Sequence, residues 1–210
     1  MLAVSYDRTA MLNVLRPTVS RVLNPVGRAL ADRGVSPNMV TAAGTLGTVA
    51  SALYFFPRGE LVWGALAVAV FAFSDMIDGA VARARGGTGS RWGAFLDSSL
   101  DRISDAAIFS ALTWHFFTDG QPVLAGVTLF CLVAGMLVSY VKARAEGLGM
   151  TCDVGLAERP ERLGVVLLSA LLGGLGVPYL PAAGLWLLAV ASAYTVVQRL
   201  LHVRRQAMTQ

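Results

Sequence analysis

Apolar residues run along this chain in long stretches, separated by short groups of charged, proline and glycine residues. Each stretch approaches the roughly 20 residues that an α-helix needs to cross a bilayer, and the fifth stretch is the shortest. The pattern therefore predicts an all-α protein, an integral membrane bundle of six transmembrane helices. The predicted spans are residues 39–56, 61–83, 92–116, 122–141, 163–177 and 182–201.

The first 36 residues differ from the rest because arginines recur among their apolar positions. Leucines and valines return at helical spacing between positions 12 and 30, with Arg16, Arg21 and Arg28 between them, which is typical of an amphipathic helix at a membrane surface. A surface helix packed on the bundle is the alternative. We expect residues 1–36 to form a cytoplasmic juxtamembrane arm, 37–205 the six-helix domain, and 206–210 a C-terminal tail.

Composition and charge support a membrane protein. Hydrophobic residues make up 55% of the chain, and the formal net charge is +4. Basic residues gather in the arm, after the second and fourth predicted helices and at the end of the sixth, whereas the opposite connections hold one arginine, Arg58. The positive-inside rule then predicts a multi-pass protein of the cell membrane with both termini in the cytoplasm. The positive charge favours an anionic membrane surface and anionic substrates, and nucleic acid is a poor alternative.

Four aspartates interrupt the second and third apolar stretches, at Asp75, Asp78, Asp97 and Asp101. A carboxylate inside a membrane helix costs roughly 2.5 to 3.5 kcal/mol on insertion scales, so four are tolerated only if something neutralises them. Spacings of three and four residues place each pair on one face of its helix. Two such faces make an all-oxygen cage, which suits Mg²⁺ or Mn²⁺ and not zinc. The sequence predicts a cytoplasmic site for divalent cations and a group bound to them.

The aspartates belong to a longer pattern, Asp75-x-x-Asp78-Gly79-x-x-Ala82-Arg83 followed by Gly93-x-x-x-Asp97-x-x-x-Asp101. At every defined position it resembles the signature of the CDP-alcohol phosphotransferases, and the six-helix layout extends the resemblance over nearly the whole chain. Members of that family join a CDP-linked lipid to an alcohol, release CMP and use two divalent cations. The resemblance implies two ligand sets, Asp75, Asp78 and Asp97 for one ion and Asp75, Asp97 and Asp101 for the other. It also implies that Asp101 is the general base, and it suggests a homodimer.

The same resemblance implies contacts to CDP-diacylglycerol around the cations. Gly79 and Ala82 leave room for cytidine, while Arg83 and Ser90 follow the second helix at positions suited to holding phosphate oxygens. Residues at the start of the first membrane helix also contact the nucleotide in family members. The predicted set is Asn38, Met39, Val40, Thr41, Gly79, Ala82, Arg83 and Ser90.

Basic residues near the cytoplasmic ends of the later helices are candidates for binding the acceptor alcohol. A compact ammonium and several forked guanidiniums suit an acceptor that itself carries a phosphate. The predicted phosphate contacts are Lys142, Arg159, Arg162 and Arg199. The alternative is that these side chains anchor the protein to lipid headgroups, which we prefer for Arg144, Arg204 and Arg205. The segments 142–146 and 158–162 look like those of an actinobacterial branch of the family, whose acceptor is inositol 1-phosphate.

Three functions are compatible with these residues. The leading one is transfer of the phosphatidyl group of CDP-diacylglycerol to inositol 1-phosphate, giving phosphatidylinositol phosphate and CMP. Glycerol 3-phosphate is a close alternative acceptor, because it is also phosphorylated. A divalent-metal transporter is less favoured, since the aspartates gather near one face and no acidic residue continues a path through the other half of their helices.

Asp105 extends the four-residue spacing beyond Asp101 and could be a fifth metal ligand. The signature ends at Asp101, however, so we expect Asp105 to pair with a nearby arginine instead. Arg102 is expected to balance a neighbouring carboxylate.

Overall fold

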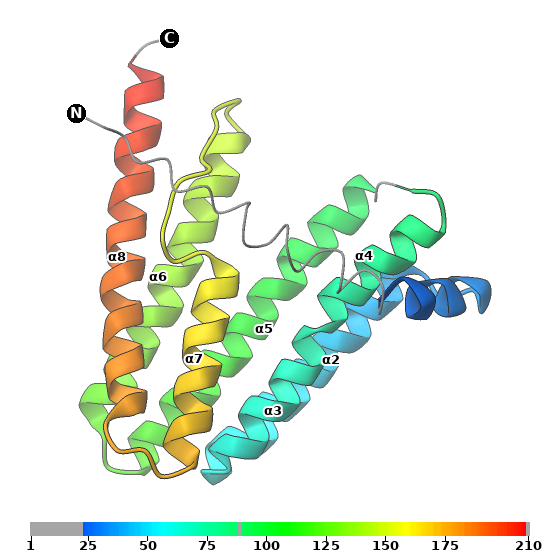
Figure 1. Ribbon diagram of the computed structural model, residues 1–210. Coiled ribbons are helices and arrows are strands. Elements are labelled where there is room, and N and C mark those ends of the chain that lie inside the picture. The colour runs from blue at the N-terminus through cyan, green and yellow to red at the C-terminus, as the bar shows by residue number, and fades with distance from the viewer. Residues whose placement is uncertain (1–22, 88–89, 209–210) are drawn as a thin grey trace. The chain divides into compact units, whose positions relative to one another are not determined.

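The computed structural model describes residues 23–87 and 90–208, except for the side chain of Asp75, and these residues form helices and no strand. The predicted all-α class is thereby confirmed. After a helical stretch at 23–32 the chain continues through the elements shown in Figure 1. They are α2 (Pro37–Phe55), the 3₁₀ turn η1 (Phe56–Arg58), α3 (Leu61–Ala72), α4 (Ser74–Ala84), α5 (Arg91–Thr118), α6 (Pro122–Glu146), α7 (Arg159–Gly174) and α8 (Leu180–Ala207).

Four stretches among the described residues are long and apolar enough to cross a membrane. They are Pro37–Arg58, Leu61–Ala84, Pro122–Glu146 and Leu180–Ala207. The other two predicted spans correspond to α5, which carries several charges in its first half, and to α7, which has 16 residues. The structure thus supports a helical membrane protein with four such spans.

The second predicted helix, residues 61–83, is divided in the structure at Phe73. The backbone of Phe73 keeps helical angles, φ −63° and ψ −16°, but Met76 N–H donates to the carbonyl of Phe73, three residues back. This tightened turn ends α3 and starts α4, so the prediction of one continuous helix is corrected. Asp75 and Asp78 therefore belong to the first turns of a short separate helix.

The described chain forms two compact units. The first comprises residues 23–44 and Ala72–Leu100, and the second comprises Thr45–Phe71 and residues 101–208. In the first unit, the helical stretch 23–32 packs against α4 through Gly27, where a Cβ would lie 2.7 Å from the backbone of Ala80. This part of the N-terminal arm is packed on the protein, as in the alternative interpretation. Residues 1–22, which hold most of the predicted interfacial helix, lie outside the described residues.

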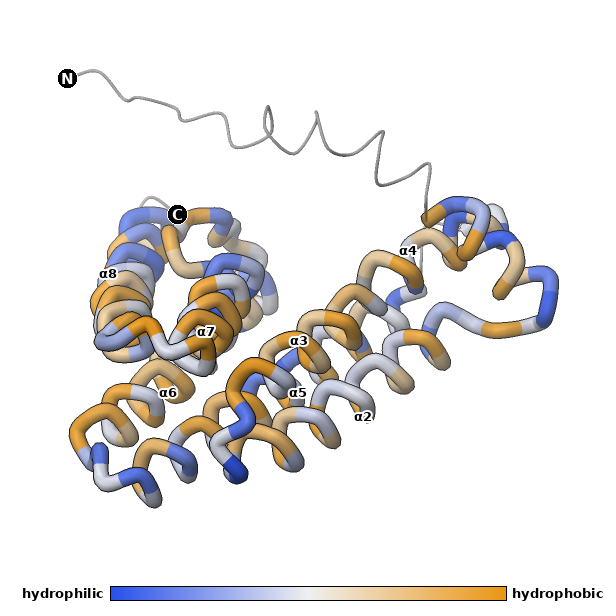
Figure 2. Tube along the Cα trace, turned by 60° about the horizontal axis from the view of Figure 1, so that its bottom comes forward, coloured by the Kyte–Doolittle hydropathy of each residue, from blue (hydrophilic) through white to orange (hydrophobic). Residues whose placement is uncertain are grey.

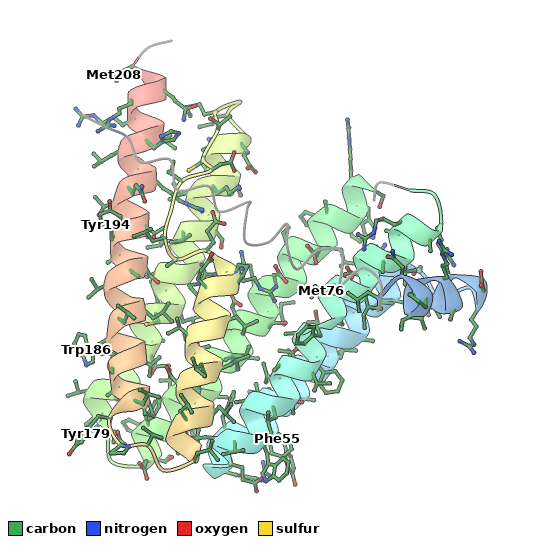
Figure 3. The ribbon with its side chains drawn as sticks, in the orientation of Figure 1. Phe55, Met76, Tyr179, Trp186, Tyr194 and Met208 are labelled. Carbon is green, nitrogen blue, oxygen red and sulfur yellow. The ribbon has the colours of Figure 1, made fainter. Side chains whose placement is uncertain are left out.

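In the second unit, α8 packs against both α6 and α7, and the three helices lie side by side in Figure 1. Its core includes the buried side chains of Phe56, Val68, Ile108, Leu112 and Leu185. The outer face of α8 carries Trp186 and Tyr194, which extend away from α6 and α7 in Figure 3 and are 51% and 54% exposed. Figure 2 shows hydrophilic residues at the C-terminal end of α8, where Arg204 and Arg205 lie. An apolar outer face that ends in basic residues suits a helix whose outer face contacts lipid.

Candidate functional site

The N-terminal halves of α2 and α4 meet at a carboxylate of the predicted metal site. Thr41 of α2 donates from its hydroxyl to Asp78 Oδ2 of α4, at 2.5 Å, and Thr41 is 6% exposed. A predicted nucleotide contact and a predicted metal ligand are thus neighbours in the first unit. Asp75 is on the same helix, three residues before Asp78, but its side chain lies outside the described part.

The start of α5 brings together other residues of the predicted nucleotide set. Ser90 caps the helix, because its Oγ accepts the N–H of Gly93 at 2.9 Å. A Cβ on Gly93 would lie 3.2 Å from both Asn38 Oδ1 and Ser90 Oγ, so the glycine allows Asn38 to approach this cap. A serine hydroxyl that accepts one hydrogen bond can still donate its own proton, so Ser90 has the chemistry to bind a phosphate oxygen.

Arg83 folds back along α4 over one of the predicted glycines. A Cβ on Gly79 would lie 3.3 Å from Arg83 Nη1, which makes Gly79 a position where the guanidinium passes close to the helix backbone. The predicted role of Gly79 was to leave room for cytidine. The structure places the Arg83 guanidinium close to Gly79, and the role toward cytidine stays a prediction.

The donors at the predicted metal site are of one chemical type. Asp97 and Asp101 lie one turn apart on the continuous helix α5, and Asp75 and Asp78 lie on α4. Among the side chains that the structure describes, no group of three or more carboxylate, histidine or cysteine side chains is gathered closely enough to hold an ion. That set lacks Asp75. The four carboxylates fit a hard cation such as Mg²⁺ or Mn²⁺ by their chemistry.

Two carboxylates of α5 are held by arginines in the second unit. Asp101 Oδ1 lies 2.8 Å from Arg159 Nη1, and Asp105 lies 3.5 Å from Arg159 Nε. Asp105 Oδ2 also lies 3.1 Å from Arg162 Nη2 and 3.5 Å from Arg102 Nη2. The expected pairing of Asp105 with arginine and of Arg102 with a carboxylate is confirmed. Asp105 is 6% exposed, and its pairs with Arg159 and Arg162 connect it to the start of α7 inside the protein.

The segment 147–158 between α6 and α7 is tied to both α6 and α8. Lys142 Nζ of α6 lies 2.6 Å from Asp153 Oδ1 and 3.8 Å from Glu146 Oε1. The hydrogen bond from Lys142 lowers the pKa of the exposed Asp153 carboxyl, so Asp153 keeps its charge to a lower pH than an unpaired aspartate would. Near the end of α8, the Gln206 side chain accepts from Thr151 N–H and donates to Thr151 C=O, at 3.1 and 2.6 Å.

Arg199 of α8 is buried and donates hydrogen bonds both to this segment and to α6. Its Nε donates to Val154 C=O at 2.7 Å, Nη1 to Val138 C=O at 2.6 Å, and Nη2 to Glu158 Oε1 at 3.1 Å. Arg199 and Arg162 are each 2% exposed. Direct contact with an acceptor phosphate, as the sequence predicts for both, would require these guanidiniums to share or leave their present partners.

The predicted acceptor residues fall into two pairs. Arg159 and Arg162 meet at Asp105, whereas Lys142 and Arg199 hold the segment 147–158. Sequence reasoning missed the partners of that segment, above all Thr195. Its position four residues before Arg199 places it on the same face of α8, which was the available signal.

The sequence model of the CDP-alcohol phosphatidyltransferase family matches residues 34–197. The match spans most of the chain, from the turn before α2 to the last part of α8. This chain belongs to the CDP-alcohol phosphatidyltransferase family, as the aspartate pattern predicted.

Several relatives within that family carry the name phosphatidylinositol phosphate synthase. The phosphatidylinositol phosphate synthase of Streptomyces avermitilis is 49% identical over 208 residues, covering 94% of this chain and 84% of its own. The crystal structure of the Mycobacterium tuberculosis phosphatidylinositol phosphate synthase with CDP-DAG bound has a TM-score of 0.83 and 47% identity, covering 87% of this chain and 94% of that one. The same enzyme in complex with manganese and citrate has a TM-score of 0.82 and 46% identity, covering 86% and 88%.

Proposed function

We propose that this chain is a membrane enzyme that transfers the phosphatidyl group of CDP-diacylglycerol to inositol 1-phosphate, giving phosphatidylinositol phosphate and CMP. The observation that carries this proposal is the similarity over nearly the whole chain to phosphatidylinositol phosphate synthases, with the aspartate signature complete at every defined position. Family membership favours this transfer over ion transport.

In the proposed reaction, a hydroxyl oxygen of the acceptor attacks the lipid-bearing phosphorus of CDP-diacylglycerol, and the bond from that phosphorus to the CMP oxygen breaks. Asp101 takes the proton of the attacking hydroxyl. Two divalent cations, Mg²⁺ or Mn²⁺, offset the charge of the diphosphate and stabilise the departing oxygen when they are bound. Asp75, Asp78 and Asp97 hold one ion, and Asp75, Asp97 and Asp101 hold the other.

The remaining predicted contacts orient the lipid nucleotide. Arg83 and the Ser90 hydroxyl bind its phosphate oxygens, while Gly79 and Ala82 make room for cytidine. Residues 38–41 contact the nucleotide from the start of α2. The hydrogen bond from Thr41 to Asp78 supports this arrangement, because it joins the nucleotide set to the metal set.

The proposed topology has six membrane spans, with α5 and α7 as the third and fifth, and both termini and the active site in the cytoplasm. The distribution of arginines along the chain supports this orientation. The arm at 1–36, the domain at 37–205 and the tail at 206–210 remain the proposed division, and the homodimer stays a prediction.

The acceptor is tested with purified protein in detergent or vesicles, labelled CDP-diacylglycerol and three acceptors. We expect efficient transfer to inositol 1-phosphate and poor transfer to glycerol 3-phosphate and to free inositol, which would leave the basic residues without an anion. If glycerol 3-phosphate were preferred, the chemistry would stand and the acceptor assignment would change.

Lys142→Gln and Arg159→Gln test the phosphate contacts separately from the fold, because these side chains are 36% and 20% exposed. Each is expected to raise the apparent KM for inositol 1-phosphate roughly tenfold or more, since a charge-assisted hydrogen bond contributes about 1.5–3 kcal/mol. The KM for CDP-diacylglycerol should stay within about twofold. Arg144→Gln, an exposed arginine two residues from Lys142, is the matched control and should change neither constant. An unchanged KM for inositol 1-phosphate in both variants would contradict the phosphate contacts and favour the alternative that Lys142 and Arg159 bind lipid headgroups.

Asp153→Asn is expected to lower the KM for inositol 1-phosphate, the opposite of the effect of Lys142→Gln. Asp153 neutralises Lys142 in the structure and competes with an incoming phosphate for the ammonium. Its removal should lower the KM for inositol 1-phosphate by about two- to threefold, the modest size expected of an exposed pair. Glu146→Gln is the control, because Glu146 lies 3.8 Å from the same ammonium and should have a smaller effect. A higher KM in Asp153→Asn would show that Asp153 positions Lys142 instead of competing for it.

A further inference from the structure

A threonine in the middle of α8 is bonded to the chain just before α7. Thr195 is fully buried, and its Oγ1 accepts the N–H groups of Leu156 and Ala157 at 3.2 and 3.1 Å. The same hydroxyl donates to Ala191 C=O at 2.8 Å. A hydroxyl has one donor and two acceptor positions, so all three are in use. Thr195 therefore has no remaining capacity to bind a substrate and acts on the backbone of this segment.

The residue that faces Thr195 in this segment is Gly155, because the backbone lies too close to Thr195 for a side chain. A Cβ on Gly155 would lie 2.6 Å from Thr195 Cγ2 and 3.4 Å from Arg199 Nε. Gly155 also has φ +145°, which a residue with a side chain rarely adopts. The glycine at this position and the close packing both indicate that the backbone at 155–157 contacts one face of α8 directly.

Ala157 connects this contact to the arginines of α7. Its N–H is held by Thr195, and its carbonyl accepts Arg162 Nη1 at 3.1 Å. Two residues later Arg159 begins α7 and reaches Asp101. Arg162 in turn reaches Asp105. One buried hydroxyl therefore fixes the backbone from which both guanidiniums are presented to the carboxylates of α5.

We propose that Thr195 is a positioning residue for acceptor binding, which sets the placement of Arg159 and Arg162 without touching the substrate. This proposal rests on the proposed function, in which those arginines serve the acceptor phosphate. Loss of the hydroxyl removes the partner of the buried Ala157 N–H and of the partly buried Leu156 N–H, so the segment moves away from α8 for part of the time. The acceptor then binds only to the fraction of molecules that keep the arginines in place, and its apparent affinity falls by that fraction.

Thr195→Val and Thr195→Ser separate the hydroxyl from the shape of the side chain. Valine fills the same space without a hydroxyl, and serine keeps the hydroxyl without Cγ2. We expect Thr195→Val to raise the KM for inositol 1-phosphate by about five- to tenfold, with the KM for CDP-diacylglycerol within about twofold of wild type. Thr195→Ser should restore the acceptor KM to within about twofold.

The matched control is Thr128→Val. Thr128 is also fully buried, but among the described residues its hydroxyl bonds within its own helix, to Leu124 C=O at 2.8 Å. It should change neither KM. An equal rise of both KM values in Thr195→Val, or the same behaviour in Thr195→Val and Thr128→Val, would overturn the proposal.

Hydrogen exchange of the whole protein in detergent gives a second readout that needs no turnover. Peptides containing Leu156 and Ala157 should exchange at least about fivefold faster in Thr195→Val than in wild type or Thr195→Ser, and peptides from the start of α6 should not change. Unchanged exchange at 156–157 would overturn the proposal. Wild-type protein that transfers nothing to inositol 1-phosphate would instead refute the proposed function, while the exchange experiment would still decide whether Thr195 holds the segment.

Discussion

Asp97→Asn is expected to abolish phosphatidyl transfer without unfolding the protein. In the proposed site Asp75 and Asp97 each contact both cations, so the loss of one carboxylate charge weakens the binding of both cations. Asparagine keeps the size of the side chain, and Asp97 lies on a continuous helix of 28 residues, so the fold should persist. We expect turnover to fall by at least about 10²–10³-fold, because removal of a single group that stabilises transition-state charge typically has an effect of this size. Asp75→Asn should behave in the same way.

The control for this experiment is Asp119→Asn. Asp119 is an exposed carboxylate just beyond the other end of α5, bonded by Gln121 Nε2 at 2.6 Å, and its loss should leave turnover unchanged. Chelation of the wild-type protein should stop the reaction, and added Mg²⁺ or Mn²⁺ should restore it. Near wild-type turnover in Asp97→Asn, or full turnover in excess chelator, would contradict a two-cation site.

Asp101→Asn is expected to lower the catalytic rate by about two to four orders of magnitude while CDP-diacylglycerol still binds. Asparagine cannot take the proton of the attacking hydroxyl, but its carbonyl oxygen can still accept Arg159 Nη1, which lies 2.8 Å from Asp101 Oδ1. Asp105 continues to hold the same arginine. The start of α7 should therefore stay in place, and the lower catalytic rate would come from the missing proton acceptor.

Rate and binding must be measured on the same preparation to decide between the two roles of Asp101. Equilibrium binding of CDP-diacylglycerol in the presence of Mg²⁺ should match that of wild type, and the rate alone should fall. If binding and rate fell together, as expected for a carboxylate that mainly holds a cation, the assignment of Asp101 as the base would be wrong.

The helices could be predicted from the sequence because apolar runs of membrane length are a local signal. The aspartate pattern was equally local, since spacing alone defines the faces of α4 and α5 and leads to the family. The division at Phe73 was missed because no proline or glycine marks it, and a one-residue change in hydrogen bonding leaves the apolar pattern intact.

The environment of the basic residues could not be predicted in this way. In the sequence, Arg162 and Arg199 look like the other arginines of the predicted cytoplasmic side, yet both are buried. Arg162 bonds to Asp105, 57 residues earlier, and Arg199 bonds to Val138 C=O, 61 residues earlier. Such pairings depend on how the helices pack, which a single sequence does not encode locally. Thr195 was missed for the same reason, because its partners are 38 and 39 residues earlier.

Unequal helix length sets a condition on the surrounding lipid. At 1.5 Å per residue, the 16 residues of α7 rise about 24 Å and the 28 residues of α8 about 42 Å, against a hydrocarbon layer of about 30 Å. In the proposed six-span topology, the short α7 is accommodated by a thinner bilayer beside it, by flanking side chains that reach the interface, or by entry of the chain before α7 into the layer. Irregular backbone at that depth persists only when protein groups satisfy it, and Thr195 and Arg199 do this at 154–157. Hydrophobic mismatch would then make activity sensitive to acyl-chain length in reconstituted membranes.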